Sequence, residues 1–152
     1  MKRIVIILSA LLLFSLLSYS QKLAPDKIPA PVKQSFTRMF STATGVKYQM
    51  EKKDYEVNFI EKGVGMSANF DALGNWLETE TEIKPADLPK EITASVAKNF
   101  AGFKIVEVGK VEKPNTGVVY EMDLKKDKEG FEVQFSPDGD VLKKVPWKEE
   151  KD

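Results

Sequence analysis

The chain has 152 residues, with 23 basic and 23 acidic side chains and neither cysteine nor histidine. Their absence excludes Ser–His and Cys–His catalysis and sites built from thiolate or imidazole ligands, and it leaves stability to a packed core without disulfides. The balanced charge, 21 basic against 23 acidic once Lys2 and Arg3 are set aside, argues against nucleic-acid binding. We therefore expect no nucleic-acid partner, no cofactor and no metal, and predict that the protein is not an enzyme.

Residues 1–20 have the pattern of a secretory signal peptide. Two basic residues precede an apolar run from Ile4 to Leu17, and the small residues Ser18 and Ser20 follow. The run of about 14 residues is shorter than the roughly 20 that a membrane-spanning helix needs. We expect cleavage after Ser20, a periplasmic or secreted location, and no stable membrane span after cleavage.

The rest of the chain repeats one pattern, with copies at residues 28–83 and 88–147. A leader, residues 21–27, precedes the first copy, residues 84–87 link the two, and a charged tail occupies residues 148–152. Each copy begins with an apolar residue and a proline, followed by apolar residues at helical spacing, which predicts an amphipathic helix. These apolar positions are Val32, Phe36 and Phe40 in the first copy and Ile92, Val96 and Phe100 in the second.

Each predicted helix is followed by four predicted strands. The first begins near Val46 or Lys104, and alternating segments at 55–59 and 66–70 match 120–124 and 131–135. Hairpin loops follow at 71–75 and 136–140, where Gly74 and Gly139 suit a positive φ, and Trp76 and Val141 open the fourth strands. The predicted fold class is α+β, two tandem repeats of an N-terminal helix packed on a four-stranded antiparallel sheet. Each copy has little core alone, so we expect one continuous domain.

Several motifs recur in the same order in both copies. They are an Ile-Pro or Leu-Pro helix start, an aromatic helix end, Tyr-Glu-Val or Tyr-Glu-Met, and, in the second copy, Phe-Ser-Pro-Asp-Gly-Asp. Through them the chain, from about Ala24 to Trp147, resembles the PepSY-like family of exported proteins, whose fold is similar to that of the beta-lactamase inhibitory protein. The resemblance implies tandem helix-on-sheet repeats and a role in binding or inhibiting another protein, with related PepSY modules thought to restrain peptidases. The inhibitory protein uses disulfides and loop residues that have no counterpart here, so beta-lactamase inhibition is an analogy of fold only.

One face of the predicted sheet is polar and open to water, as antiparallel sheets allow. Alternating carboxylates on one strand are typical of a solvated sheet surface rather than of a glycosidase pair. Counting alternate residues also places both tryptophans on this face, where a large aromatic can anchor a partner; the alternative is that a loop or the other repeat covers Trp76. An acidic face favours a basic partner. The candidate protein-binding residues are Trp76, Glu78, Glu80, Glu56, Asn58 and Trp147.

These observations predict an exported, non-catalytic module that binds a protein of the cell envelope through the open sheet face. It would inhibit or regulate an envelope enzyme such as a peptidase. The alternative is a periplasmic sensor of calcium or of a small ligand, because Ser136, Asp138 and Asp140 offer oxygen atoms at close spacing. The matching loop 71–75 keeps the glycine but loses most of these oxygens, which favours a plain hairpin.

Overall fold

The computed structural model describes residues 21–147, and the predicted signal peptide and charged tail lie outside this range. Within it, no helix is long and apolar enough to cross a membrane. The leader contains β1 (Gln21–Leu23) and η1 (Pro25–Lys27), and the linker contains η2 (Pro85–Asp87). The first repeat contains α1 (Ala30–Met39), β2 (Thr44–Glu51), β3 (Asp54–Glu61), β4 (Val64–Phe70) and β5 (Trp76–Glu82). The second contains α2 (Lys90–Asn99), β6 (Lys104–Lys113), β7 (Gly117–Lys126), β8 (Glu129–Phe135) and β9 (Val141–Pro146).

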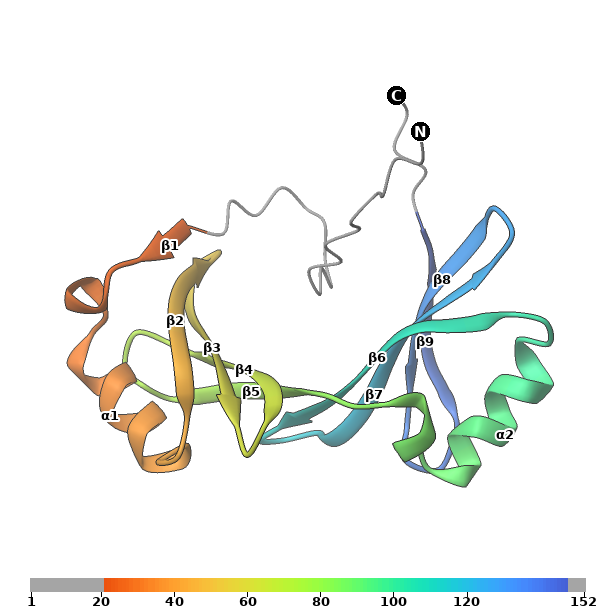
Figure 1. The fold of residues 1–152 in the computed structure, drawn as a ribbon, viewed down its shortest axis with the longest axis horizontal. Helices are drawn as coiled ribbons and strands as arrows, with labels where there is room; N and C mark the ends of the chain where they lie inside the picture. The colour runs from red at the N-terminus through yellow and green to blue at the C-terminus, as the bar shows by residue number, and fades with distance from the viewer. Residues whose placement is uncertain (1–20, 148–152) are drawn as a thin grey trace.

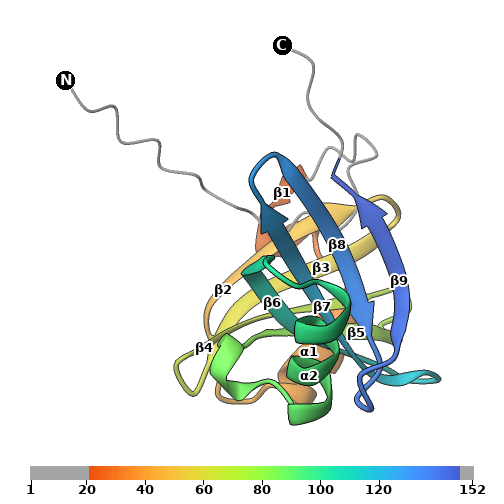
Figure 2. The same cartoon turned by 90° about the vertical axis from the view of Figure 1, so that its right-hand side faces the viewer.

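All described strands form one nine-stranded antiparallel sheet whose spatial order is the order of the sequence. The sheet is strongly curved, and α1 and α2 lie near its opposite ends (Figures 1 and 2). The α+β class and the tandem repeat are confirmed. The two predicted four-stranded sheets are, however, halves of one sheet, joined where β5 pairs with β6 from Thr79↔Glu112 to Glu82↔Gly109. The leader supplies the ninth strand, because β1 pairs with β2.

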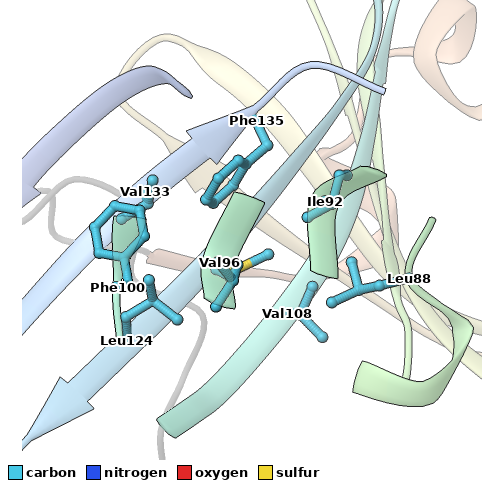
Figure 3. Close-up of a cluster of buried hydrophobic side chains, with 9 residues drawn as sticks. Leu88, Ile92, Val96, Phe100, Val108, Leu124, Val133 and Phe135 are labelled. Carbon is cyan, nitrogen blue, oxygen red and sulfur yellow. The ribbon is translucent and has the colours of Figure 1, made fainter. Parts of the chain in front are cut away.

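Each helix packs its apolar stripe on its own half of the sheet. Around α1, the buried side chains are Ile28, Val32, Phe36, Phe40, Val57, Phe59, Ala68 and Phe70. Around α2, they are Leu88, Ile92, Val96, Phe100, Val108, Met122, Leu124, Val133 and Phe135 (Figure 3). These equivalent clusters occupy the helix side of the sheet, and no helix of residues 21–147 lies on the opposite side, which we call the open face.

Two structural features explain the glycines of the two matching hairpins. Gly74 and Gly139 have φ of +83° and +86°, a region that favours glycine. A Cβ on Gly74 would also lie 2.6 Å from the carbonyl oxygen of Pro31, and one on Gly139 would lie 2.5 Å from that of Glu91. The hairpins therefore pack backbone against backbone on the first turns of α1 and α2.

The predicted position of Trp76 on the open face is wrong. The β4–β5 register shifts at the hairpin, so that Asn69 faces Glu78 whereas Phe70 faces Trp76. A β-bulge of this kind reverses the alternation and turns the next side chain to the other face. Trp76 packs against the α1 cluster, and its Nε1 donates a hydrogen bond to Oγ1 of the buried Thr79 at 2.9 Å.

Candidate functional site: the open face of the sheet

Strand pairing places the other candidate residues on the open face. Glu56 faces Asn69, and Asn58 faces Ser67 across β3 and β4. The acidic residues that share this side of the strands are Glu51, Asp54, Glu56, Glu78, Glu80, Glu82, Glu107, Glu121, Asp123 and Glu132. The basic ones are Lys22, Lys47, Lys113, Lys125 and Lys143. The face thus carries an excess of carboxylates, and the predicted positions of Glu56, Asn58, Glu78 and Glu80 are confirmed.

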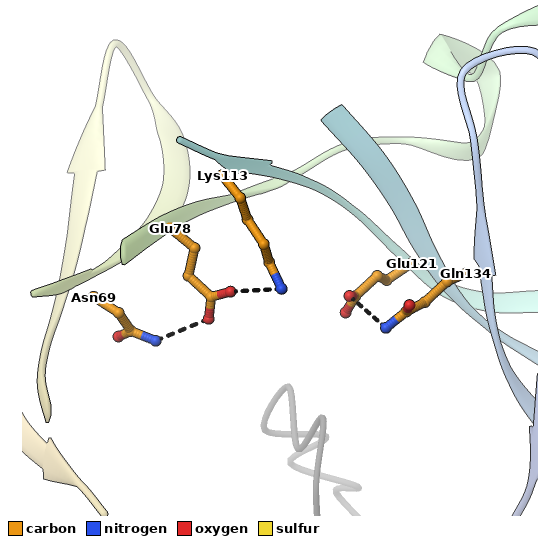
Figure 4. A network of polar contacts seen from close by, with 5 residues as sticks. All are labelled: Asn69, Glu78, Lys113, Glu121 and Gln134. Carbon is orange, nitrogen blue, oxygen red and sulfur yellow. Dashed lines mark hydrogen bonds and ion pairs between the residues drawn. The ribbon is translucent and has the colours of Figure 1, made fainter. Parts of the chain in front are cut away.

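Hydrogen bonds and an ion pair hold several of these carboxylates in place. Glu78 accepts a hydrogen bond from Asn69 Nδ2 at 3.0 Å and pairs with Lys113 Nζ at 3.0 Å (Figure 4). Glu121 accepts a hydrogen bond from Gln134 Nε2 at 2.9 Å. These partners come from neighbouring strands, so the pairing of the sheet itself orients the carboxylates.

Glu80 differs because its Oε1 is buried and has no hydrogen-bond partner among the described residues. The carboxyl group lies over Gly109 of β6, where an added Cβ would stand 2.9 Å from Oε1, and its strand partner is the buried Val111. Burial, followed by the negative charges of Glu121 and Glu78, raises the pKa of Glu80 to about 8. Glu80 is therefore mostly protonated at neutral pH, although it stands among carboxylates that can ionise.

Burial also governs the protonation of Glu121, which is 7% exposed. Its pKa is raised to about 6, chiefly by burial; the nearby Lys113 opposes this rise and Glu78 adds to it. Burial likewise raises the pKa of Glu107, Asp123 and Glu132. The negative charge of the open face is therefore smaller near neutral pH than its residues suggest, and it increases with pH.

Trp147 lies on the open face, as predicted, at the outer end of the second repeat. Its ring covers Gly130, where any Cβ would overlap it, and 38% of the residue is exposed. The side chain also influences Asp123, where it opposes the rise that burial causes in the pKa of that carboxyl group. Lys125 Nζ lies 5.8 Å from the ring centroid. The tryptophan is therefore held in one orientation with part of its surface free.

Two glycines and one amide side chain of this face were not predicted from the sequence. Glu82 lies over Gly65 just as Glu80 lies over Gly109, and a Cβ on Gly65 would stand 2.6 Å from Glu82 Oε2. A glycine inside a strand often marks such a close approach, so Gly65 and Gly109 were the available signals. Asn69 was missed as well; its Oδ1 is buried without a hydrogen-bond partner in the described part of the chain.

No group of three or more Asp, Glu, His or Cys among residues 21–147 is placed to hold a metal ion. In the hairpin loops, the oxygens serve the turns themselves. Asp71 Oδ1 accepts hydrogen bonds from the backbone N–H groups of Leu73 and Asn75, each at 2.9 Å, and Ser136 Oγ accepts one from the N–H of Asp140 at 3.1 Å. The open face, rather than these loops, is therefore the candidate site.

Comparison with known proteins agrees with this architecture. The chain matches the model of the family described as "Putative beta-lactamase-inhibitor-like, PepSY-like" at residues 18–67 and 53–143. Among curated proteins, none matches it.

Crystal structures from Bacteroides species have the same fold. A BLIP-like protein of Bacteroides fragilis is 21% identical, with a TM-score of 0.74 over 82% of this chain and 90% of that one. A DUF2874 family protein of Bacteroides ovatus is 22% identical, with a TM-score of 0.74 over 78% of this chain and 86% of that one. A protein of Bacteroides eggerthii described as periplasmic is 20% identical, with the same TM-score over 78% and 88%. The family match covers both repeats and most of the described sheet, and the chain belongs to the beta-lactamase-inhibitor-like, PepSY-like family.

Proposed function

We propose that this protein is an exported, non-catalytic binding module that docks a protein partner of the cell envelope on the open face of its sheet. The observation that carries the proposal is the asymmetry of the sheet. Both helices and both core clusters cover one side, whereas the other side presents oriented carboxylates and the half-exposed Trp147.

Several features support a binding role for this face. Nine strands hold it in one shape, so little conformational entropy is lost on association. Glu78, Asn69 and Lys113 are already joined by hydrogen bonds and an ion pair, which fixes the polar groups before a partner arrives. The similarity to a BLIP-like protein supports the more specific proposal that the partner is an envelope enzyme, for example a peptidase, which this module inhibits or regulates.

The test is affinity capture from an envelope extract with two charge-matched variants. Glu82→Lys with Glu107→Lys changes the open face, whereas Glu91→Lys with Glu129→Lys makes the same change in net charge on α2 and on the helix side of β8. We expect the second variant to retain a partner that the first loses, and the purified partner to change its enzymatic rate when wild-type protein is added. Retention by the open-face variant together with loss by the control would place the binding surface elsewhere.

A further inference from the structure

We propose that the open face receives a basic segment of its protein partner, with one arginine or lysine side chain paired to Glu80. This inference rests on the proposed function and names the chemistry of the partner. It starts from the centre of the sheet, where Oε1 of Glu80 has no donor among the described residues, whereas Glu78 and Glu121 each have one.

Glu80 lines a hollow of about 920 Å³ on the first half of the sheet. Acidic residues Glu56 and Glu82 line this hollow together with the apolar Ile60, which shares the open face. Its two lysines, Lys22 and Lys47, come from β1 and β2, whereas Glu80 and Glu82 come from β5. A long cationic side chain fits such a lining, because its methylene groups pack on apolar surface while its charged end meets a carboxylate.

Two buried oxygen atoms of the face can accept hydrogen bonds from a partner protein. Asn69 Oδ1 and, once its carboxyl group is ionised, Glu80 Oε1 are acceptors, and neither has a hydrogen-bond partner among the described residues. Asn69 faces Glu78, two residues before Glu80 on the same strand, so Asn69 and Glu80 are diagonal neighbours. Long side chains can bridge such neighbours, and a guanidinium group offers several N–H donors and no acceptor.

The arrangement of the carboxylates favours a polypeptide over a metal ion. They are distributed over strands from β2 to β8, and no three of the described acidic residues converge as metal ligands do. A series of separated negative charges matches several cationic side chains along one segment. Charge complementarity of this kind contributes to specificity and to the rate of association.

Pairing with a cation changes the protonation of Glu80. The charged residues that act on Glu80 or line the same hollow are Glu56 of β3, Glu78 and Glu82 of β5, Glu107 of β6, Glu121 of β7, Lys22 of β1 and Lys47 of β2. The carboxylates among them disfavour its ionisation, and a bound cation favours it. Because the free protein holds this proton at neutral pH, binding should release it, which binding to a fully ionised surface would not do.

The experiment measures binding of a synthetic peptide of alternating glycine and arginine by titration calorimetry in two buffers of different ionisation enthalpy. The proteins compared are the wild type, Glu80→Gln, and a control with the same type of substitution, Glu129→Gln, on the helix side of β8. At neutral pH we expect the wild type and the control to release a proton on binding. We expect Glu80→Gln to release much less and to bind at least about tenfold more weakly, a loss of about 1.4 kcal/mol.

Three results would overturn the inference. They are no binding of the peptide, the same loss of peptide affinity in both glutamine variants, or binding of calcium chloride at the same carboxylates as tightly as the peptide. The first two would leave the proposed function standing if the envelope partner is still lost from the Glu82→Lys, Glu107→Lys variant. If capture of that partner is also unaffected, the proposed function fails too. The peptide result and the capture result therefore test separate claims.

Discussion

The carboxyl group of Glu80 lies directly over Gly109 on the neighbouring strand, where an added Cβ would be 2.9 Å from Oε1. The glycine makes room for the carboxyl group to lie flat on the sheet, away from water. Val111 faces Glu80 across the same strand pair and is 3% exposed, which adds to the cost of a negative charge there. This contact joins the two repeats at the one place where their strands pair.

Stability should fall as the pH rises, because of Glu80. Its pKa is about 8 in the folded protein, against 4.5 for a glutamate side chain in water, so the folded state holds the proton more tightly. The resulting stabilisation is complete below about pH 4.5 and is lost as the pH rises through about 8. This contribution to the free energy of unfolding is roughly 3–5 kcal/mol. Urea unfolding of Glu80→Gln should show a smaller decline between these pH values than the wild type, and identical declines would contradict the burial of this charge.

The hairpin glycines should be sensitive to substitution for a reason beyond their backbone angle. Gly63 has a φ of +82° like Gly74, but nothing lies within 4 Å of its Cβ position. Gly63→Ala should therefore cost about 1 kcal/mol of unfolding free energy, the usual cost of a positive φ. Gly74→Ala and Gly139→Ala should cost at least about 2 kcal/mol, because their Cβ atoms meet helix backbone. Equal costs at all three positions, measured by urea unfolding, would disprove the hairpin–helix contact.

The hydrogen bond between Trp76 and Thr79 should contribute to stability. Trp76→Phe keeps an aromatic ring against the α1 cluster but leaves the buried Thr79 hydroxyl without its donor. We expect a loss of about 1–2 kcal/mol in thermal or urea unfolding. The double variant Trp76→Phe with Thr79→Val should recover part of this loss. If Trp76→Phe leaves the stability unchanged but this variant no longer captures the envelope partner, Trp76 belongs to the binding surface instead.

Both repeats should unfold in one transition, since one sheet runs through them. Trp147→Phe leaves Trp76 as a fluorescent probe of the first repeat, and Trp76→Phe leaves Trp147 as a probe of the second. In each background, Phe70→Leu and Phe135→Leu, which alter fully buried rings, should both lower the urea midpoint reported by the remaining tryptophan. A substitution in one repeat that leaves the midpoint reported from the other repeat unchanged would mean that the repeats unfold independently.

The sequence predicted the local parts of this fold well. The proline helix starts, the apolar stripe from Val32 to Phe40 and the hairpin glycines act over a few residues, and the structure has them where they were expected. The joining of β5 to β6 was not predicted as a sheet continuation, because the facing residues Thr79 and Glu112 carry no local signal of pairing. The leader strand β1 was missed because its three residues lack a recognisable alternation.

The candidate site was predicted only in part, and each wrong or missing prediction has a physical cause. Alternation correctly placed Glu78 and Glu80 on the open face, but the bulge beside Phe70 moved Trp76 to the other side. The protonation of Glu80 depends on Gly109 and Val111, which are distant in sequence and adjacent only in the folded sheet. Periodicity within one strand therefore identifies a face, whereas the chemistry of that face depends on the neighbouring strands.

The most direct test of this account is a carboxyl-carbon NMR titration of Glu80, performed on the free protein and on the protein saturated with the glycine–arginine peptide. In the free protein, Glu80 should titrate near the pKa of about 8, and the peptide should lower that value. A Glu80 that titrates near 4.5, or whose titration is unaffected by the peptide, would contradict the central claim that this buried carboxyl group receives the cation of a basic partner.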